Sequence, residues 1–274
     1  VARAGEQQQI LKFVAFGAIN HQSLIATKTA RVVYAAQGDG VMEFGLRRAQ
    51  GPDAGIYGAR AAMIGGCIGT SNVLAGQLFD VPVKGTHAHS WIMSFPDEYT
   101  AFKKYSELYP DACILLVDTY DTLKSGVPNA IRVFTEMREA GIPLTFYGIR
   151  LDSGDLAYMS KKARKMLDEA GFPDAVISAS SDLDEYLITS LKDQGAAITS
   201  WGVGTNMITS SDCPAFGGVY KLAAVLDEEG EFVPKIKLSE NTEKITNPGN
   251  KTIFRIYDNE TGKIRADLIS LADE

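Results

Sequence analysis

Two of the chain's three histidines lie in one short stretch, the GTHAHS segment of residues 85–90. An apolar run stops at Gly85, so we expect a strand that delivers Thr86, His87 and His89 to a site at its C-terminal end. At alternate positions of an extended chain, the two imidazoles would point to the same side. Such histidines act as nucleophiles or proton carriers, or they are hydrogen-bonded edge or core residues. One H-x-H pair with no cysteine close by offers too few ligands for a metal.

Polar residues also follow four apolar runs further along the chain. The runs at 112–117, 143–149, 175–177 and 196–201 alternate with helical patterns, which predicts a parallel sheet covered by helices. The C-terminal ends of such strands carry the site in α/β barrels and doubly wound sheets. Asp118 and Ser181 at these ends have a purely structural explanation as well, because Asp and Ser cap helices. Arg150 is no capping residue, and it therefore favours a site.

These groups suit an anionic sugar phosphate. A Gly202-x-Gly204-Thr205 loop can present backbone N–H groups and a hydroxyl to phosphate, although such a loop alone is a weak signal. Asp152 and Asp155 could hold ribose hydroxyls or hydrated Mg²⁺. The guanidinium fork matches carboxylate and pyrophosphate, and the arginines placed to use it are Arg47, Arg48 and Arg150.

Composition excludes several other classes of function. The net charge of −7 and the sequence pI near 5.1 argue against nucleic acid or an anionic membrane as the partner. Three scattered cysteines are typical of a reduced, cytoplasmic protein. The uncharged stretch 61–79 is too rich in Gly, Ser, Thr and Asn to cross a membrane. We interpret it instead as two short helices, the first ending at Gly65-Gly66 and the second capped by Thr70 or Ser71.

The ends of the chain are less regular. We expect a helix over Ser23–Ala30, after a break at Asn20-His21, and a strand over Arg31–Ala35. His21 is expected at a helix start or in the core. A change of composition after Leu226 and alternating runs beyond it predict antiparallel strands of a second domain. We therefore expect a barrel core over 1–226 and part of a second domain over 227–274. The first residue is not Met and an apolar run lies close to the end, so we expect a fragment of a longer protein.

Several segments together resemble the nicotinate phosphoribosyltransferase family. They are EFGLRRAQGP at 43–52, IGGCIGTSNVLA at 64–75, GTHAHS at 85–90, IRLDSGDL at 149–156, GVGT at 202–205 and GGVYKL at 217–222. The resemblance implies an irregular α/β barrel of the type II phosphoribosyltransferases with part of a second, sandwich-like α/β domain, assembled as a homodimer. Val1–Gln22 fits the family less cleanly than the rest of the chain, so no site is placed there. The family's N-terminal region, which supplies a substrate-stacking aromatic, and the end of its C-terminal region are not matched.

The resemblance also implies a reaction. Nicotinate and phosphoribosyl pyrophosphate would give nicotinate mononucleotide and pyrophosphate, coupled to ATP hydrolysis with Mg²⁺ or Mn²⁺. His89 would be phosphorylated, Thr86 would touch nicotinate, and Arg150 would pair with its carboxylate. His87 occupies a variable position of the motif and receives no role. Phosphoribosyl pyrophosphate would be held by Thr205 at the 5-phosphate and by Gly202, Gly204, Asp152, Arg47, Arg48 and Lys221, with Asp152 or Asp155 near the metal.

Three alternatives stay open. Quinolinate and nicotinamide phosphoribosyltransferases share the architecture, although the GTHAHS and RLDSGD stretches favour nicotinate. A barrel aldolase or isomerase would use the Gly-rich loop, but it should also show a lysine or an acid/base pair at a strand end. A catalytically inert ligand-binding or scaffold fragment would bind the same molecules without turnover.

Overall fold

The computed structural model describes residues 2–272, and it describes the side chains of 17–242 and 244–272. The chain divides after Phe216 into two compact units, whereas the composition changes after Leu226. None of the helices among the described residues is long and apolar enough to cross a membrane.

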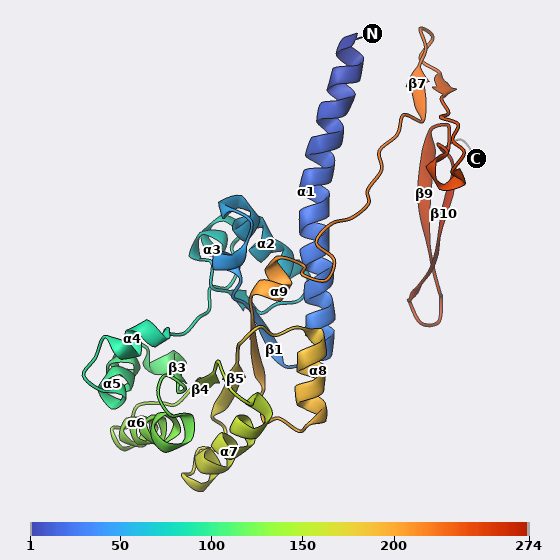
Figure 1. Ribbon diagram of the computed structural model, residues 1–274. Helices are drawn as coiled ribbons and strands as arrows, with labels where there is room; N and C mark the ends of the chain where they lie inside the picture. Colours follow the sequence, from blue (N-terminus) through green and yellow to red (C-terminus); the bar gives the residue numbers. More distant parts are fainter. Residues whose placement is uncertain (1, 273–274) are drawn as a thin grey trace. The chain divides into compact units, whose positions relative to one another are not determined.

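The first unit is built on a curled parallel sheet in the order β2-β1-β6-β5-β4-β3 (Figure 1). This is the cyclic order of a barrel, because β1 lies between β2 and the last strand, β6. Val83 continues the curl through a single parallel bridge to Thr70 of β2. One seam stays open, between this segment and β3, so the α/β barrel predicted from the sequence is present in irregular form. The strands are β1 (Gly40–Glu43), β2 (Gly69–Thr70), β3 (Cys113–Leu116), β4 (Tyr147–Leu151), β5 (Val176–Ala179) and β6 (Ser200–Val203).

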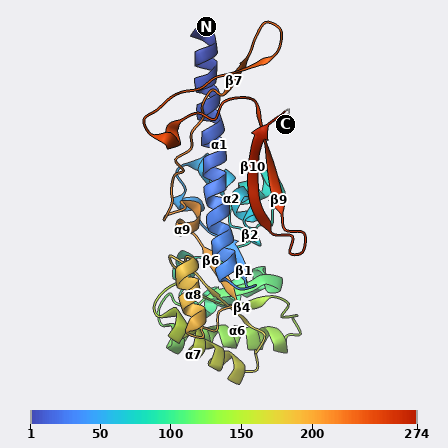
Figure 2. The same ribbon diagram turned by 90° about the vertical axis from the view of Figure 1, so that its right-hand side faces the viewer.

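Helices cover the outer face of the sheet. Neighbouring helices pack in the pairs α1–α2, α1–α8, α5–α6 and α6–α7, and Figure 2 shows α1 running beside α8. The α-helices are α1 (Ala2–Ala35), α2 (Pro52–Ile64), α3 (Val73–Phe79), α4 (His89–Met93), α5 (Glu98–Leu108), α6 (Val127–Glu139), α7 (Leu156–Glu169), α8 (Glu185–Asp193) and α9 (Thr205–Ile208). Short 3₁₀ turns lie at η1 (Leu46–Arg48) and η2 (Pro110–Ala112), and η3 (Thr122–Gly126) is a π-turn.

The core lies between the sheet and these helices. The four expected apolar runs all became strands, and Leu115, Ile149 and Trp201 within them are inaccessible to solvent. A parallel sheet is covered on its faces, so its strands need apolar residues at every position. Helix α6 meets the sheet through a stripe at helical spacing that includes Ala130 and Phe134. Each large side chain buried in this way stabilises the fold by about 2 kcal/mol.

The helix expected over Ser23–Ala30 is present, but the break before it and the strand after it are wrong. Helix α1 runs without a break through Asn20-His21 and includes 31–35, where a strand was expected. The β-branched pair Val32-Val33 suggested the strand. Seven positions here are buried and recur at a helical spacing of three and four residues: they are Leu24, Ile25, Lys28, Thr29, Val32, Ala35 and Ala36. No proline or glycine interrupts the segment, so packing of this stripe decides its conformation.

Two other local predictions need correction. Helix α3 is capped by Asn72, whose side chain accepts a hydrogen bond from Ala75 N–H at 3.0 Å, and not by Thr70 or Ser71. The segment expected to be a strand before Gly85 makes only the one bridge at Val83. Pro82 lacks an N–H, which limits the ladder that this segment can form.

The second unit consists of two antiparallel pairs, as the alternating pattern predicted. Strands β7 (Ala224–Leu226) and β8 (Phe232–Pro234) form one pair. Strands β9 (Lys251–Tyr257) and β10 (Ile264–Leu271) form the other, and a 3₁₀ turn, η4 (Thr242–Lys244), lies between the pairs in sequence. The exposed side chains of β9 and β10 are mostly apolar, so this unit has little core of its own.

Candidate active site

A cavity of about 390 Å³ opens at the C-terminal ends of β1, β4, β5 and β6. Because neighbouring parallel strands end at the same edge of a sheet, residues far apart in sequence meet there. Its lining residues are Phe44, Arg47, Arg48, Ala88, His89, Arg150, Asp152, Ser180, Ser181, Asp182, Gly202, Gly204 and Thr205. Eight of the residues expected from the sequence are among them.

Arg150 lies on β4 with its guanidinium directed at the GTHAHS segment. Its Nη1 donates a hydrogen bond to the hydroxyl of Thr86, the other residue expected to contact nicotinate. Its Nε is buried and has no acceptor among the described residues. Burial lowers the pKa of Arg150, while Asp152 and Asp118 oppose that shift, and an arginine stays charged in any case. The site therefore holds a partly desolvated cation, which is suited to a carboxylate.

His89 is the first residue of α4 and is bracketed by polar partners. Its Nδ1 lies 3.0 Å from the hydroxyl of Thr119. Its Nε2 lies 3.6 Å from Oδ2 of Asp152 and 3.9 Å from Oδ1 of Asp118. Which atom donates between Nδ1 and the Thr119 hydroxyl depends on the tautomer of the ring. With Nδ1 protonated, Nε2 would carry the lone pair, on the side of the ring that faces the two carboxylates. The two carboxylates can stabilise positive charge on the ring.

The two carboxylates are themselves fixed by the strand ends. Oδ2 of Asp118 accepts hydrogen bonds from the backbone N–H of Asp152 at 2.9 Å and from the Ser153 hydroxyl at 2.6 Å. Asp152 accepts a hydrogen bond from the hydroxyl of Ser180. Asp118 is thus no helix cap. It ties the end of β3 to the end of β4, and Ser180 ties the end of β5 to both.

The loops after β5 and β6 form the opposite wall. Ser181 and Asp182 both have positive φ, at 102° and 44°, which is unusual and costly for non-glycine residues in succession. Asn206 supports this turn by donating to the carbonyl oxygens of Asp182 at 2.8 Å and Leu183 at 3.3 Å. Gly202 is required for a different reason. A Cβ there would lie 2.6 Å from ring carbons of Phe44, so glycine lets that ring cover the strand.

Arg47 and Arg48 are presented by the turn η1, and a buried carboxylate holds its start. Glu43 is inaccessible to solvent; it accepts hydrogen bonds from Gly45 N–H and from the Thr70 hydroxyl. Burial raises the pKa of Glu43, and these two hydrogen bonds oppose the shift. Glu43 therefore joins the C-terminal ends of β1 and β2 next to the turn that carries the two arginines.

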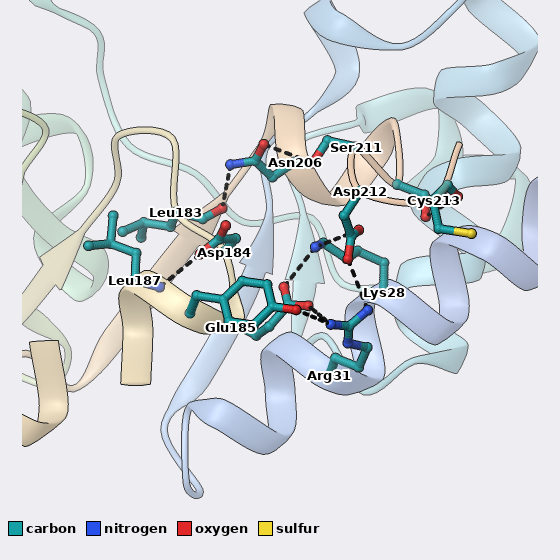
Figure 3. A network of polar contacts seen from close by, with 12 residues as sticks. Lys28, Arg31, Leu183, Asp184, Glu185, Leu187, Asn206, Ser211, Asp212 and Cys213 are labelled. Carbon is teal, nitrogen blue, oxygen red and sulfur yellow. Dashed lines mark hydrogen bonds and ion pairs between the residues drawn. The ribbon is translucent and has the colours of Figure 1, made fainter. Parts of the chain in front are cut away.

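A ring of four charged side chains lies behind the β5 and β6 loops (Figure 3). Lys28 pairs with Glu185 and with Asp212, both at 2.8 Å, and Arg31 pairs with the same two carboxylates at 2.8 and 3.0 Å. Burial opposes the charge on Lys28, but the two carboxylates outweigh it and raise the pKa of the amine. The ring connects α1, the start of α8 and the segment after α9, and so holds the two loops from behind.

Two expected residues of the first unit, His87 and Asp155, do not line the cavity. His87 is buried and not in the cavity, so the expectation that it shares a side with His89 is wrong. The reason is that α4 begins at His89, which ends the alternation of an extended chain. Asp155 caps α7 by accepting from Tyr158 N–H at 2.9 Å, and it does not line the cavity. Lys221 belongs to the second unit, where its amine donates to the Lys244 carbonyl.

Sequence reasoning missed several contributors. Thr119, Ser180 and Asp182 received no role, and Phe44 was quoted only as part of a motif. Asp118 and Ser181 were singled out at strand ends but left with a capping explanation. The signal available for all of them was position, since each lies within three residues after the end of a strand.

No group of three or more potential metal ligands occurs among the described residues. Mg²⁺ in phosphate chemistry needs only one or two carboxylates, because substrate phosphates and waters complete its shell. Asp152 fits that need: it lines the cavity, and its side chain is 35% exposed. Asp118, with a side chain 2% exposed, is enclosed and already hydrogen-bonded.

A sequence model of the nicotinate phosphoribosyltransferase (NAPRTase) family matches residues 40–226. The chain belongs to this family. The nicotinate phosphoribosyltransferase of Bacillus subtilis is 55% identical over 268 residues, which are 98% of this chain and 54% of that protein. A crystal structure of human nicotinic acid phosphoribosyltransferase superposes with a TM-score of 0.80 at 30% identity, covering 97% of this chain and 59% of that one.

A solved structure with a different name is also similar to this chain. The nicotinate-nucleotide pyrophosphorylase of Pyrococcus furiosus superposes with a TM-score of 0.70 at 26% identity, over 94% of this chain and 60% of that one. The family resemblance expected from the sequence is thus confirmed, together with the barrel. The chain spans about half the length of the curated nicotinate phosphoribosyltransferases it matches.

Proposed function

We propose that the protein is a nicotinate phosphoribosyltransferase, which converts nicotinate and phosphoribosyl pyrophosphate into nicotinate mononucleotide and pyrophosphate. The observation that carries the proposal is the pairing of Arg150 with Thr86 at the edge of a cavity that is also lined by His89, the Gly202–Thr205 loop and the two arginines of η1. A carboxylate-binding cation and a phosphate-binding wall in one cavity match both substrates. Membership of the family supports the same reaction.

Nicotinate would bind with its carboxylate on Arg150. The Arg150 side chain lines the cavity, and its planar guanidinium fork gives two-point recognition of a carboxylate. Thr86 would keep the guanidinium oriented. The uncharged amide of nicotinamide would leave the same cation without a counter-ion, which disfavours it in a partly desolvated site.

Phosphoribosyl pyrophosphate would lie along the opposite wall. Its 5-phosphate would meet Thr205 and the backbone of Gly202–Gly204, and its pyrophosphate would meet Arg47 and Arg48 on η1. Asp152 would hold Mg²⁺ or Mn²⁺ together with the substrate phosphates, and the ion would offset charge on the departing pyrophosphate. Asp155 is the weaker candidate because it caps α7.

The proposed reaction depends on the positioning of the two substrates more than on acid–base catalysis by the protein. The nicotinate ring nitrogen forms a bond to the anomeric carbon while the carbon–oxygen bond to pyrophosphate breaks, through an oxocarbenium-like state. The cavity would align the two reacting atoms and exclude water from them. The cations of η1 would stabilise the negative charge that builds on the leaving group.

ATP would be coupled through His89. Nε2 would attack the γ-phosphoryl group with release of ADP, and hydrolysis of the phosphohistidine would follow product formation. The position of Nε2, opposite the nitrogen that Thr119 holds, supports this role. A homodimer in the cytoplasm is the assembly and location that we propose with it.

The test is product formation by the purified protein. Nicotinate, nicotinamide and quinolinate are each supplied with phosphoribosyl pyrophosphate, Mg²⁺ and ATP, and the mononucleotide is quantified by chromatography. The proposal expects nicotinate to be preferred by at least about a hundredfold in kcat/KM, the size of one lost charged hydrogen-bond pair. Quinolinate as the preferred substrate would assign the pyrophosphorylase reaction. Calorimetric binding of nicotinate without turnover would assign an inert ligand-binding role.

A further inference from the structure

The open seam of the sheet leaves one edge of β3 without a neighbouring strand. Along β3, the N–H groups of Cys113 and Val117 donate to the carbonyls of Phe146 and Arg150, at 3.0 and 3.2 Å, on the β4 side. Backbone N–H groups alternate between the two sides of a strand. The N–H of Leu116 therefore points away from β4, into the seam.

A side chain fills the place of the missing strand. Nε2 of His87 lies 3.2 Å from Leu116 N and accepts its hydrogen bond, as a carbonyl of a neighbouring strand would. A ring nitrogen that accepts must be unprotonated, so the proton of a neutral His87 resides on Nδ1. The imidazole is 6% exposed and packs against the rings of Phe102 and Tyr105 from α5, with centroids 6.1 and 4.6 Å away.

The residues on either side of His87 belong to the proposed active site. Thr86, directly before it, contacts Arg150, and Ala88, directly after it, lines the cavity beside His89. The segment has little other backbone support, because the sheet bridge ends at Val83 and α4 begins only at His89. Its position therefore depends on the imidazole between these two points.

We infer that His87 is a positioning residue: its neutral imidazole bridges the barrel seam to Leu116 and thereby fixes Thr86, and through it Arg150, in the orientation that receives the nicotinate carboxylate. The kinetic part of this inference rests on the proposed function, whereas the hydrogen bond across the seam does not. Burial, reinforced by the charge of Arg150, lowers the pKa of His87 to about 4, which keeps Nε2 an acceptor at neutral pH.

The experiment compares His87→Gln with His87→Leu. Glutamine places an amide oxygen near the position of Nε2 and keeps the acceptor, whereas leucine keeps apolar volume and removes it. Amide hydrogen exchange is measured without substrate. We expect Leu116 to exchange about tenfold faster in His87→Leu, the size of one buried hydrogen bond, and to change little in His87→Gln. Val117, which donates to β4, is the internal control.

The kinetic arm measures nicotinate KM and kcat in the same variants. We expect His87→Leu to raise the KM about tenfold with a smaller change in kcat, and His87→Gln to restore the KM to within about threefold. An unchanged Leu116 exchange rate in His87→Leu, or equal damage by both substitutions, would overturn the inference. Faster exchange with an unchanged KM would overturn the positioning role while leaving the proposed reaction intact.

Ring ¹⁵N shifts of the wild-type protein test the bond without any substitution. We expect Nε2 of His87 to be unprotonated from pH 8 down to about pH 5, consistent with an acceptor in a buried site. A protonated Nε2 at neutral pH would overturn the inference even if both variants failed to fold. If the wild-type protein shows no turnover, only the proposed function is refuted. The hydrogen bond between His87 and Leu116 can still be tested, because amide exchange and ring ¹⁵N shifts are measured without substrate.

Discussion

Nε2 of His89 lies 3.6 Å from a carboxylate oxygen of Asp152, although the two residues stand on different strand exits. Oδ1 of Asp118 lies 3.9 Å from the same nitrogen. Oδ2 of Asp118 accepts a hydrogen bond from the backbone N–H of Asp152. One histidine therefore faces two carboxylates, and the carboxylate of Asp118 is hydrogen-bonded to the backbone of Asp152. The relative positions of these three side chains are thus fixed by contacts between the two strand ends.

The first prediction concerns His89. If this residue couples ATP to product formation, His89→Ala should abolish ATP stimulation and leave a slow, reversible, ATP-independent transfer. His87→Gln is the matched control, because it alters the neighbouring histidine while sparing the ring in the cavity, and it should keep ATP stimulation. Turnover with and without ATP, together with acid-labile phosphate on the protein, measures the effect. A His89→Ala enzyme with a full ATP response would contradict the assignment.

Thr205→Val should raise the KM for phosphoribosyl pyrophosphate while the fold survives. The substitution removes one hydroxyl at the start of α9 and keeps its shape, so one charge-assisted hydrogen bond to the 5-phosphate would be lost. That bond is worth about 1.5–3 kcal/mol, or roughly ten- to a hundredfold in KM. Thr209→Val in the same segment is the control, since its hydroxyl donates to the Thr205 carbonyl and does not line the cavity. Equal KM values for Thr205→Val and wild type would place the phosphate elsewhere.

The continuous apolar runs allowed the sheet and its site-bearing edge to be predicted. Residues 113–116, 147–151, 176–179 and 200–203 are buried on both faces, so their sequences carry an unambiguous signal. Helix α5 had a signal that was overlooked, because Asp97 caps it and Ala101, Phe102 and Tyr105 form a buried stripe. The hydrogen bonds that join Asp118 to Asp152, and His87 to Leu116, could not be predicted, because they depend on how strands meet across the sheet.

Stability should depend on pH through His87. Its pKa is about 4 in the folded chain against 6.5 for the ordinary side chain. The unfolded chain therefore takes up the proton first, so stability is full above about pH 6.5 and falls as the pH drops toward 4. At pH 5 the loss is about 2 kcal/mol. Urea unfolding at pH 7 and pH 5 should show this loss in the wild type.

His87→Gln isolates that contribution. The pKa of His21 is also lowered by burial and acts in the same direction, so the difference between wild type and His87→Gln is the informative quantity. Glutamine does not titrate, and the pH 7 to pH 5 loss should shrink by about 2 kcal/mol in the variant. An identical loss in both proteins would contradict a buried, neutral His87.

Lys28 should be among the most costly charged residues to remove. Lys28→Ala takes one cation out of the ring with Glu185 and Asp212, in which Lys28 and Glu185 are buried but the Asp212 side chain is 34% exposed. Breaking a buried pair costs about 3–5 kcal/mol, and the exposure of Asp212 together with the remaining pairs of Arg31 favours the lower end. Lys104→Ala is the control, because its pair with Glu107 is exposed and worth about 0–1 kcal/mol. Denaturant unfolding measures both. Similar losses for the two variants would mean that the ring contributes no more than a surface pair.

The central claim, that this cavity recognises the carboxylate of nicotinate through Arg150, is tested most directly by Arg150→Lys with two substrates. Lysine keeps the charge but loses the fork and its contact with Thr86, so a bidentate, partly desolvated pair would be lost at a cost of about 2–4 kcal/mol. The measurement is kcat/KM for nicotinate and for nicotinamide in the wild type and the variant. We predict a fall of roughly thirty- to a thousandfold for nicotinate and a far smaller fall for nicotinamide. Equal losses for both substrates would remove Arg150 from carboxylate recognition and contradict the proposed function.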